Sequence, residues 1–380
     1  MSGRLRSRAG LALAGMIAVL AAGAGSIAAE TPDDEPQTLA NSAPQTIKKG
    51  VWGPPTTLRG KSLFPHYRHL GIGLFQIQAR WDWIAPEQRP ADPTDPDDPA
   101  YEWPAYLTEA IAEAEDYGME VQVMIIGAPA WSNGNLSWRN PPTDPGDYAE
   151  FARAIDRRYP GVDLWMIWGE PNRRPNFGPV TPGPKSGRGP LNEAQALAPR
   201  IYAQLLDAAY GALKDESADN LVIGGNTFTS GGYESIRTYQ WINYMKLPGG
   251  GRPRMDMWGH NPWGFSKPSF RDPPTPQGLV TFSDLKRLAR KLDRAFPGEQ
   301  LELFLSEWGV PIGREDRDLH YRLKARQGKN WIRAALRIAR RWERIYTLGW
   351  IHSVDTERNS VGFFKANGRR RPAYKVYKAG

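Results

Sequence analysis

Two glutamates follow two apolar runs of the chain. Glu170 comes two residues after the run at 164–168, and Glu307 ends the run LELFLSE at 301–307. Short apolar runs of this kind are typical of buried strands. Carboxyl groups at the ends of two parallel strands would face one opening, where one can act as a general acid and the other as a nucleophile. The sequence therefore predicts a two-carboxylate site.

Composition excludes several other chemistries. The 380 residues include no cysteine, which rules out disulfides, thiolate nucleophiles and cysteine-bound metals. Five histidines are too few to favour a histidine-rich metal site. We therefore expect carboxylate chemistry that needs no metal and no organic cofactor.

Strands and helices that alternate along the chain must position these glutamates. Apolar runs predict eight strands, at 49–52, 74–80, 120–127, 164–168, 221–226, 255–261, 301–307 and 346–352. Helical periodicity predicts helices at 63–70, 105–117, 147–159, 192–214, 239–245, 282–296, 330–342 and 371–378. Strict alternation predicts an α/β fold with a parallel sheet, and eight units predict a single closed (β/α)8 TIM barrel. An open doubly wound sheet is the weaker alternative, because no glycine-rich phosphate fingerprint follows the first strand.

Long segments rich in proline and glycine follow five of the expected strands. They cover 87–100, 128–146, 171–191, 262–281 and 308–329. In a (β/α)8 barrel such loops lie on the face at the carboxyl ends of the strands, where active sites are found. Glu170 and Glu307, on the fourth and seventh strands, are expected on that elaborated face.

Further short motifs occur in order along the chain. PAW at 129–131 follows the third strand, HNPW at 260–263 closes the sixth, and GFF with RPAY lies within 362–374. Together with the two glutamates, these motifs resemble glycoside hydrolases of clan A, in the style of families 39 and 5, over about residues 48–378. The resemblance implies a retaining O-glycosyl hydrolase with Glu170 as acid/base and Glu307 as nucleophile.

Two positions depart from the pattern of that clan. Asparagine usually precedes the acid/base and binds the sugar 2-hydroxyl, but here Gly169 does. Arginine is usual in the second strand, but here Gln76 holds that position. Asn172 or Asn226 could replace the missing amide. Arg80 shares a strand face with Gln76, so it could supply the guanidinium or form a salt bridge at the barrel rim.

Polar and aromatic residues near the strand ends are candidates for binding sugar. An indole can stack on the C–H face of a sugar ring, and a polar side chain can bond a hydroxyl. Core packing is the alternative for each tryptophan and for the histidine. The candidate substrate-binding residues are Arg80, Trp131, Asn172, Asn226, His260, Trp263, Trp308 and Trp350.

Positive charge is concentrated in two loops beside the glutamates. Residues 171–193 contain four bases and one acid, and residues 311–329 contain six bases and three acids. A field of this sign could steer an anionic glycan, although a solvated arginine-rich surface has the same composition. Nucleic acid is not favoured as a partner, because no binding module is recognised. We expect a monomer that acts on a carbohydrate.

The N-terminus has the pattern of a secretory signal peptide. Basic residues lie at 4–8, an apolar stretch follows at 11–22, and small residues at 26–29 suit cleavage. We expect residues 1–29 to be removed, 30–47 to form a flexible linker and 48–380 to form the catalytic domain. The mature protein is then secreted, with cell-envelope association left open and no stable membrane insertion. An uncleaved membrane anchor is the alternative.

Two other functions suit the same residues. A transglycosidase would use the same glutamates and pass the sugar to another sugar. A catalytically silent glycan-binding barrel would explain the departures at Gly169 and Gln76.

Overall fold

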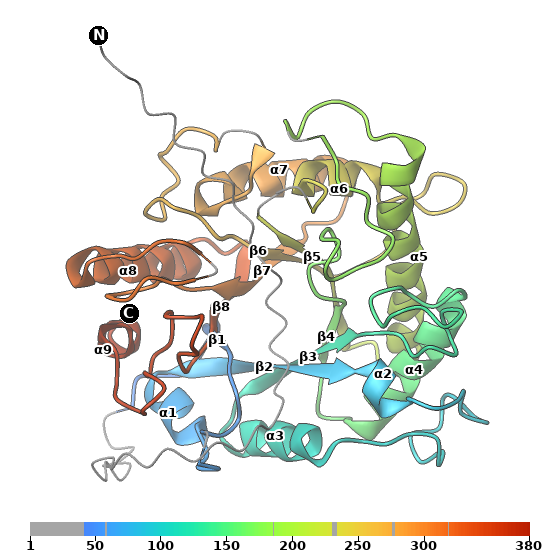
Figure 1. Cartoon of the computed structure of the whole chain (residues 1–380), viewed down its shortest axis with the longest axis horizontal. Coiled ribbons are helices and arrows are strands. Elements are labelled where there is room, and N and C mark those ends of the chain that lie inside the picture. Colours follow the sequence, from blue (N-terminus) through green and yellow to red (C-terminus); the bar gives the residue numbers. More distant parts are fainter. Residues whose placement is uncertain (1–41, 58, 185, 230–233, 276–277, 318) are drawn as a thin grey trace.

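A closed parallel barrel forms the centre of the molecule. The computed structural model describes residues 42–380 except 58, 185, 230–233, 276–277 and 318. Strands β1 to β8 follow one another in sequence order around the barrel, and β8 pairs in parallel with β1. Figure 1 shows the helices arranged around this ring of strands. The predicted (β/α)8 TIM barrel is confirmed.

The elements alternate as the sequence predicts, with small shifts of their ends. The strands are β1 (Thr46–Trp52), β2 (Ile72–Arg80), β3 (Glu120–Ile126), β4 (Leu164–Ile167), β5 (Leu221–Phe228), β6 (Met257–Asn261), β7 (Glu302–Trp308) and β8 (Ile345–Ile351). The helices are α1 (Phe64–His69), α2 (Trp81–Ile84), α3 (Ala105–Asp116), α4 (Pro145–Arg158), α5 (Glu193–Glu216), α6 (Thr238–Tyr244), the short 3-10 helix η3 (Phe282–Asp284), α7 (Leu285–Ala295), α8 (Ala325–Arg341) and α9 (Pro372–Lys378).

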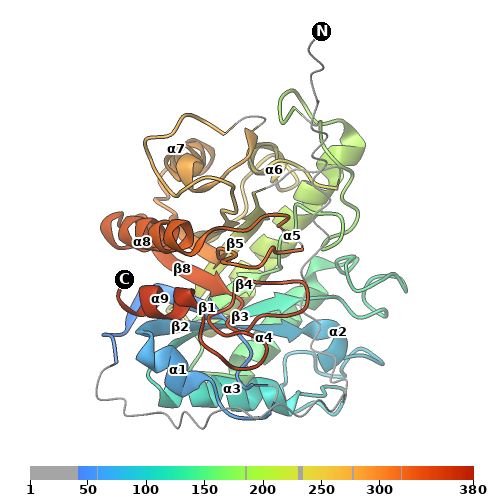
Figure 2. The ribbon, with the colours of Figure 1, turned by 60° about the vertical axis from the view of Figure 1, so that its left-hand side comes forward.

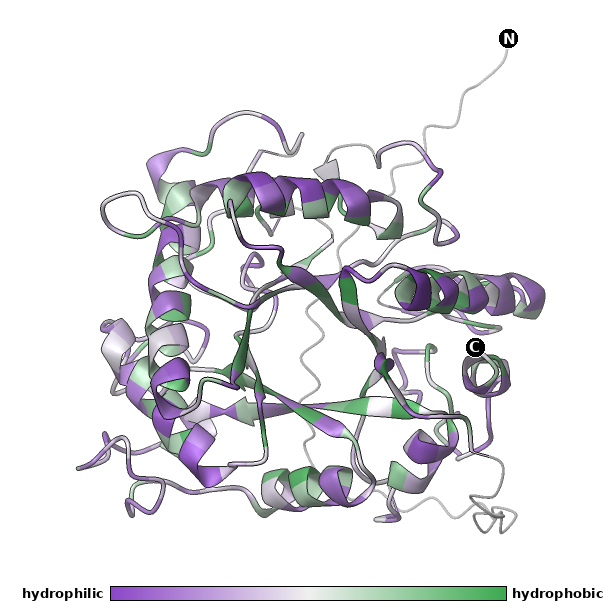
Figure 3. Cartoon of the chain, turned by 180° about the vertical axis from the view of Figure 1, so that it is seen from behind, coloured by the Kyte–Doolittle hydropathy of each residue, from purple (hydrophilic) through white to green (hydrophobic). Residues whose placement is uncertain are grey.

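The outer helices are amphipathic and pack their apolar stripes on the barrel. In α7, Leu285, Leu288 and Leu292 are buried, whereas the lysines and arginines between them face outward. Figure 3 shows this mixture of apolar and polar residues along the helices around the barrel. The main core therefore lies between the strands and the helices.

The two longest loops near β4 end at well-capped helices. Asp144 caps α4 by accepting a hydrogen bond from the Gly146 N–H at 2.8 Å. Asn192 and Gln195 form a reciprocal capping box at the start of α5. These caps fix the far ends of the loops that follow β3 and β4, and so help to hold the loops in place.

Polar side chains cross the inside of the barrel. The Gln76 amide on β2 donates to the Ser306 carbonyl on β7 at 3.0 Å, and the Ser306 hydroxyl donates to Gln76 Oε1 at 3.0 Å. The Trp52 indole on β1 donates to the same hydroxyl at 2.8 Å. Because β2 and β7 are not neighbours, these bonds span the interior and fix the strand that carries Glu307.

The C-terminal helix closes the ring of helices. Helix α9 packs beside α8, as Figure 2 also shows. The Lys49 ammonium on β1 is buried beneath it and donates to the carbonyls of Leu70 and Tyr377. Burial and, to a smaller extent, the charge of Arg340 together lower the pKa of Lys49 to about 8.

The barrel begins earlier than the sequence predicts. Strand β1 starts at Thr46, inside the range assigned to the linker, and the Gln45 amide donates to the carbonyls of Ile72 and Tyr117. Residues 42–47 thus belong to the folded body. The predicted signal peptide and the linker up to residue 41 lie outside the described residues. Within the described part, we find no helix with the length and apolar character that a membrane span requires.

Candidate active site

The chain makes a sharp turn at the end of β4, and this turn aims Glu170. Trp168 and Glu170 both have positive φ angles, 65° and 45°, in the left-handed region that L-residues seldom adopt. Trp168 is fully buried, and its indole N–H donates to the Asn176 carbonyl at 2.8 Å. This anchoring holds the turn, since strained backbone persists only where its surroundings fix it.

Three side chains hold the Glu170 carboxylate. Arg173 Nη1 donates to Oε2 at 2.5 Å, Asn176 Nδ2 donates to Oε2 at 3.3 Å, and Asn261 Nδ2 donates to Oε1 at 2.9 Å. Glu170 and Arg173 are each about 5% exposed, so this ion pair is buried. The Arg173 guanidinium also lies over the Phe228 ring at 4.5 Å. These contacts engage both carboxylate oxygens and fix the orientation of the Glu170 side chain.

Glu307 lies at the end of β7 in a different environment. Its side chain is partly exposed, and its backbone N–H donates to Asn261 Oδ1 at 3.1 Å. Burial raises the pKa of Glu307 well above its ordinary value, the charge of Glu170 raises it further, and Arg173 opposes both. The charge of Glu170 therefore acts on Glu307, and in the free protein the protonated form of Glu307 is favoured.

Asn261 joins the two glutamates. Its amide nitrogen bonds the Glu170 carboxylate, and its amide oxygen accepts from the Glu307 main chain. It ends β6, which lies between the two carboxylate-bearing strands, and it is fully buried. One side chain thus fixes the spacing between the predicted catalytic residues.

His260 does not take part in this network, which corrects its assignment as a sugar ligand. It precedes Asn261 on β6 and so points to the opposite side of the strand. It is fully buried, with Nδ1 at 2.9 Å from the Thr227 hydroxyl and Nε2 at 2.8 Å from the Val280 carbonyl. Burial lowers its pKa to about 4. The alternative, a satisfied core histidine, is the observed one.

The position of Gly169 is filled by Met124. A Cβ at Gly169 would lie 2.8 Å from the Met124 sulfur and 3.2 Å from its methyl carbon. The thioether on β3 therefore occupies the space that a side chain before the acid/base would enter. The same sulfur lies 4.0 Å from the Asn226 amide nitrogen.

The two asparagines predicted to replace that side chain differ in their contacts. The Asn172 amide nitrogen donates to the carbonyls of Phe228 and Ile236, and its oxygen accepts from the Phe228 N–H at 2.9 Å. Asn172 therefore ties the β4 loop to the end of β5, and we correct its assignment to a positioning role. Asn226 lies at a bulge of β5 with φ 37°, and its buried Oδ1 has no hydrogen-bond partner among the described residues. It keeps an open acceptor.

Arg80 forms the salt bridge at the barrel rim that the sequence left open. Its guanidinium donates to Asp82 at 2.7 and 2.5 Å and lies over the rings of Trp83 and Trp138 at 4.6 and 4.2 Å. None of these contacts is with Glu307, so Arg80 does not take the place of the arginine that the clan usually has beside its nucleophile. Gln76 supports that strand instead, through Ser306.

Two of the candidate tryptophans belong to the core. Trp308 and Trp350 are 3% and 1% exposed, and their rings pack edge to face at 5.8 Å. The Trp350 indole N–H donates to the Val361 carbonyl at 3.0 Å. With so little surface, neither presents a ring face to a sugar, which corrects their assignment.

The other two candidate tryptophans lie in loops that follow strands. Trp131 is partly exposed, and its indole N–H donates to the Ala85 carbonyl at 2.9 Å. Trp263 belongs to a small apolar cluster with Phe228 and Ile351, against which Trp52 also packs. Trp52, which the sequence analysis did not select, reaches the Glu307 strand through Ser306.

Three site residues were missed by the sequence analysis: Arg173, Asn176 and Asn261. Arg173 follows Glu170 by three residues, a spacing that can bring two side chains together across a turn. Asn261 could have been found from the two-residue period of β6, which places it opposite His260. No sequence signal indicates the Asn176 contact. Among the described residues, no cluster of three or more histidines, aspartates and glutamates is arranged to hold a metal ion.

Comparison with known proteins identifies the fold. No protein-family model and no curated protein sequence matches the chain. A glucosidase from Croceicoccus marinus superposes with a TM-score of 0.59 at 15% identity, over 89% of this chain and 66% of that chain. A family 39 glycoside hydrolase from the gut symbiont Bacteroides cellulosilyticus WH2 gives 0.58 at 16% identity, over 89% and 63%. This chain has the fold of these glycosidases.

A monomeric β-xylosidase from Caulobacter crescentus CB15 is a further match. Its TM-score is 0.55 at 16% identity, over 90% of this chain and 69% of that chain. The chain spans just under two thirds of the length of the first two relatives. The likeness therefore concerns the barrel.

Proposed function

We propose that the protein is a retaining glycoside hydrolase in which Glu307 is the nucleophile and Glu170 the acid/base. The observation that carries the proposal is the Asn261 bridge, which joins the carboxylate after β4 to the main chain of the glutamate on β7. Retaining glycosidases use two carboxyl groups only about 5 Å apart. The glucosidase and the β-xylosidase that share the fold support the same reaction class.

The first step needs an ionised Glu307 and a proton on Glu170. Burial and the charge of Glu170 raise the pKa of Glu307, and Arg173 lowers it, so in the free protein the protonated form of Glu307 is favoured. The reaction therefore requires this proton to move to Glu170 before the attack. Positive charge that develops on the anomeric carbon in the transition state then stabilises ionised Glu307.

Two displacements then complete the reaction. A Glu307 oxygen bonds the anomeric carbon, the glycosidic C–O bond breaks, and the leaving oxygen takes the proton of Glu170. Water next gives a proton to ionised Glu170 and attacks the same carbon, and the ester bond to Glu307 breaks. Arg173 assists the second step, because it stabilises Glu170 in the ionised form that acts as base.

The proposal extends to the setting of the protein. We propose that it is secreted after removal of residues 1–29, acts on a poly- or oligosaccharide and works as a monomer. The N-terminal sequence pattern supports secretion. Mass analysis of the protein recovered from culture medium tests this, with a mature N-terminus near Glu30 as the expected result.

Turnover by a Glu307→Ala variant tests the enzymatic proposal. Wild-type protein and the variant are incubated with aryl glycosides and with plant, fungal and bacterial polysaccharides, and products are read by mass. The wild type should release sugar, and the variant should lose turnover while its circular dichroism and Tm stay close to wild type. Equal product formation by both proteins would refute the assignment.

A silent glycan-binding barrel is the second candidate. The ion pair with Arg173 and the two side-chain amide hydrogen bonds favour it, since they occupy both oxygens of the carboxyl group that would have to donate a proton to the leaving group. Such a protein would bind oligosaccharides without releasing any product in the same screen. A transglycosidase would show longer products once an acceptor sugar is added.

A further inference from the structure

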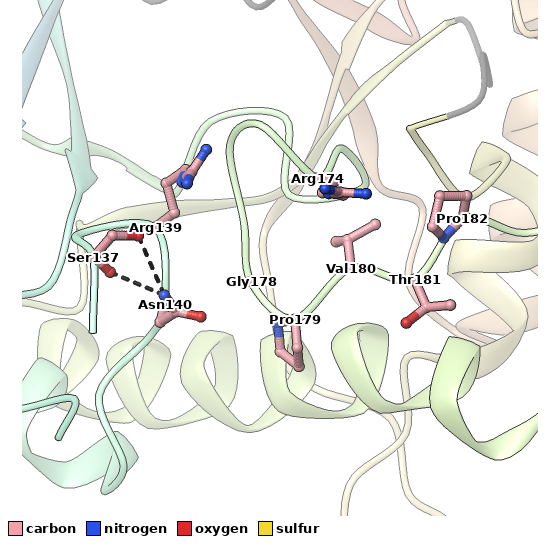
Figure 4. A pocket seen from close by; sticks show the side chains of 9 residues that line it. All are labelled: Ser137, Arg139, Asn140, Arg174, Gly178, Pro179, Val180, Thr181 and Pro182. Carbon is pink, nitrogen blue, oxygen red and sulfur yellow. Dashed lines mark hydrogen bonds between the residues drawn. The ribbon is translucent and has the colours of Figure 1, made fainter. Parts of the chain in front are cut away.

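A concave site lies between the loops that follow β3 and β4, the second of which carries Glu170. The cavity has a volume of about 470 Å³. Ser137, Arg139 and Asn140 lie on one side of it in Figure 4, and Arg174 with Val180, Thr181 and Pro182 lies on the other. This volume is within the range of about 300–1,000 Å³ that small-molecule sites occupy.

Two arginines in this cavity differ from the arginine of the active site. Arg139 and Arg174 are both exposed, and neither guanidinium has a hydrogen bond, ion pair or ring contact with any described residue. Arg173, one residue before Arg174, is instead committed to Glu170. Two neighbouring guanidiniums with free donors favour a ligand that carries negative charge.

The main chain that carries these arginines is held in place. The Gly178 N–H donates to the Arg139 carbonyl at 2.8 Å, which joins the two loops directly. The Arg174 N–H donates to the Glu234 carbonyl at 2.8 Å. The Glu234 carboxylate forms no ion pair with Arg174 within the described chain. The cavity is therefore preformed, and ordering of its backbone adds little cost to binding.

The composition of the walls suits a sugar that carries an acidic group. Pro179, Val180 and Pro182 provide apolar surface on which the C–H groups of a sugar ring can pack. The two guanidiniums can each donate two parallel hydrogen bonds to a carboxylate or a sulfate. A neutral glycan would use the apolar wall but leave both arginines without a counter-charge.

We propose that this cavity is a subsite for a sugar unit with a negatively charged substituent, located beyond the glycosidic bond that is cleaved. The proposal rests on the proposed glycosidase function for its position, because Arg174 belongs to the loop that carries Glu170. The substrate class is then an acidic oligo- or polysaccharide. Guanidinium groups donate hydrogen bonds to a carboxylate and to a sulfate in the same way, and binding of probes that carry one or the other separates them.

Calorimetric binding of three hexasaccharides tests the subsite. The probes are cellohexaose, which is neutral, a hexamer of galacturonate, which carries carboxylates, and a carrageenan hexasaccharide, which carries sulfates. Wild type is compared with Arg139→Gln/Arg174→Gln and with Arg294→Gln, which removes an exposed arginine from the last turn of α7, on another side of the barrel in Figure 1. Product mass after each titration reports any cleavage.

We expect wild type and Arg294→Gln to bind at least one acidic hexasaccharide more tightly than cellohexaose. The double variant should lose about tenfold or more of that affinity and keep its affinity for cellohexaose. The acidic probe that shows the loss identifies carboxylate or sulfate as the recognised group. Added salt should weaken acidic binding to wild type more than to the double variant.

Three results would overturn the subsite. These are equal binding of acidic probes by wild type and the double variant, an equal loss in Arg294→Gln, or no binding of either acidic probe at about 1 mM. Binding through the two arginines without any cleaved product in this titration or the glycoside screen would instead refute the hydrolase and leave the subsite standing. Cleavage of a glycoside, combined with acidic binding that does not depend on the two arginines, would refute the subsite and leave the hydrolase standing.

Discussion

Glu170 and Glu307 are the same residue type at equivalent strand ends, yet their surroundings differ in almost every respect. Glu170 follows a strained turn and is held by one guanidinium and two amides. Glu307 lies within β7, where the pairing with β8 is irregular between Leu305 and Trp308; its backbone is held by Asn261, and burial and its neighbour's charge raise its pKa. Two glutamates at strand ends therefore differ in backbone geometry and in the partners of their side chains.

The same contrast applies to the two basic loops. In the β4 loop, Arg173 serves Glu170, and Arg174 faces a cavity. In the loop after β7, Arg314 donates to main-chain carbonyls at 356, 357 and 359, and so stabilises the loop that follows β8. Two loops of similar net charge therefore make different contacts: Arg173 of the β4 loop binds Glu170, whereas Arg314 of the β7 loop binds main-chain carbonyls.

Variants of the two glutamates should differ most in how their loss of activity depends on the leaving group of the substrate. Glu170→Gln removes the proton donor, so hydrolysis of glycosides with poor leaving groups should fall by about 10²–10⁴-fold. Glycosides of dinitrophenol, which leave without protonation, should retain fast formation of the glycosyl-enzyme. Glu307→Gln should abolish turnover of both. Equal losses on both leaving groups for Glu170→Gln would remove it as the acid.

Removal of the bridge should produce the next largest effect. Asn261→Ala frees the Glu170 carboxylate on one side and the Glu307 main chain on the other, so we expect kcat to fall about 10–100-fold with a smaller change in KM. Asn261→Asp places a third negative charge beside the pair and should be worse than alanine at neutral pH. Steady-state kinetics with one aryl glycoside measures both. An unchanged kcat in Asn261→Ala would show that the bridge does not position the pair.

Arg173 should control the pH profile. Arg173→Gln removes a positive charge that lowers the pKa of Glu307, so the acidic limb of the kcat/KM profile, which reports ionisation of the nucleophile, should move to higher pH by about one unit. Arg188→Gln, which removes an exposed base from the same loop, should leave the limbs where they are. A profile that moves to lower pH, or moves equally in both variants, would contradict the ion pair's role.

His260 should affect stability rather than chemistry. Its folded pKa of about 4 lies below its ordinary value of 6.5, so the stability that neutral His260 contributes is present above about pH 6.5 and is lost as pH falls toward 4. His260→Ala leaves the buried Thr227 hydroxyl without its imidazole partner and removes one of the two side-chain hydrogen bonds to the Val280 carbonyl, which should cost about 1–3 kcal/mol of unfolding free energy. Urea unfolding at pH 7 and pH 5 measures both, and kcat at pH 7 should change less than threefold. A large loss of kcat in a folded variant would return His260 to the site.

Each strand or helix could be predicted from its own sequence pattern, but the side-chain contacts between different elements could not. The apolar runs around β3 and β7 and the helical period of α5 each depend on neighbours in the chain, and they locate the barrel and both glutamates. Thr46 was missed as a strand residue because its partners lie on β2.

The surroundings of the glutamates depend on parts of the chain that are far apart. Asn261 reaches Glu170 across 91 residues, and Gln76 reaches Ser306 across 230. Met124 fills the space at Gly169 only because β3 and β4 are adjacent. Arg80 was assigned by strand face alone, and the nearby carboxylate of Asp82 decided its contacts.

Covalent labelling tests the assignment of the two glutamates most directly. A 2-deoxy-2-fluoro glycoside of a sugar that the enzyme cleaves, with dinitrophenol as leaving group, should form a glycosyl-enzyme that hydrolyses slowly. Peptide mass spectrometry then locates the sugar. We predict a label on Glu307, in wild type and in Arg173→Gln. A label on Glu170 would contradict the account and exchange the two roles.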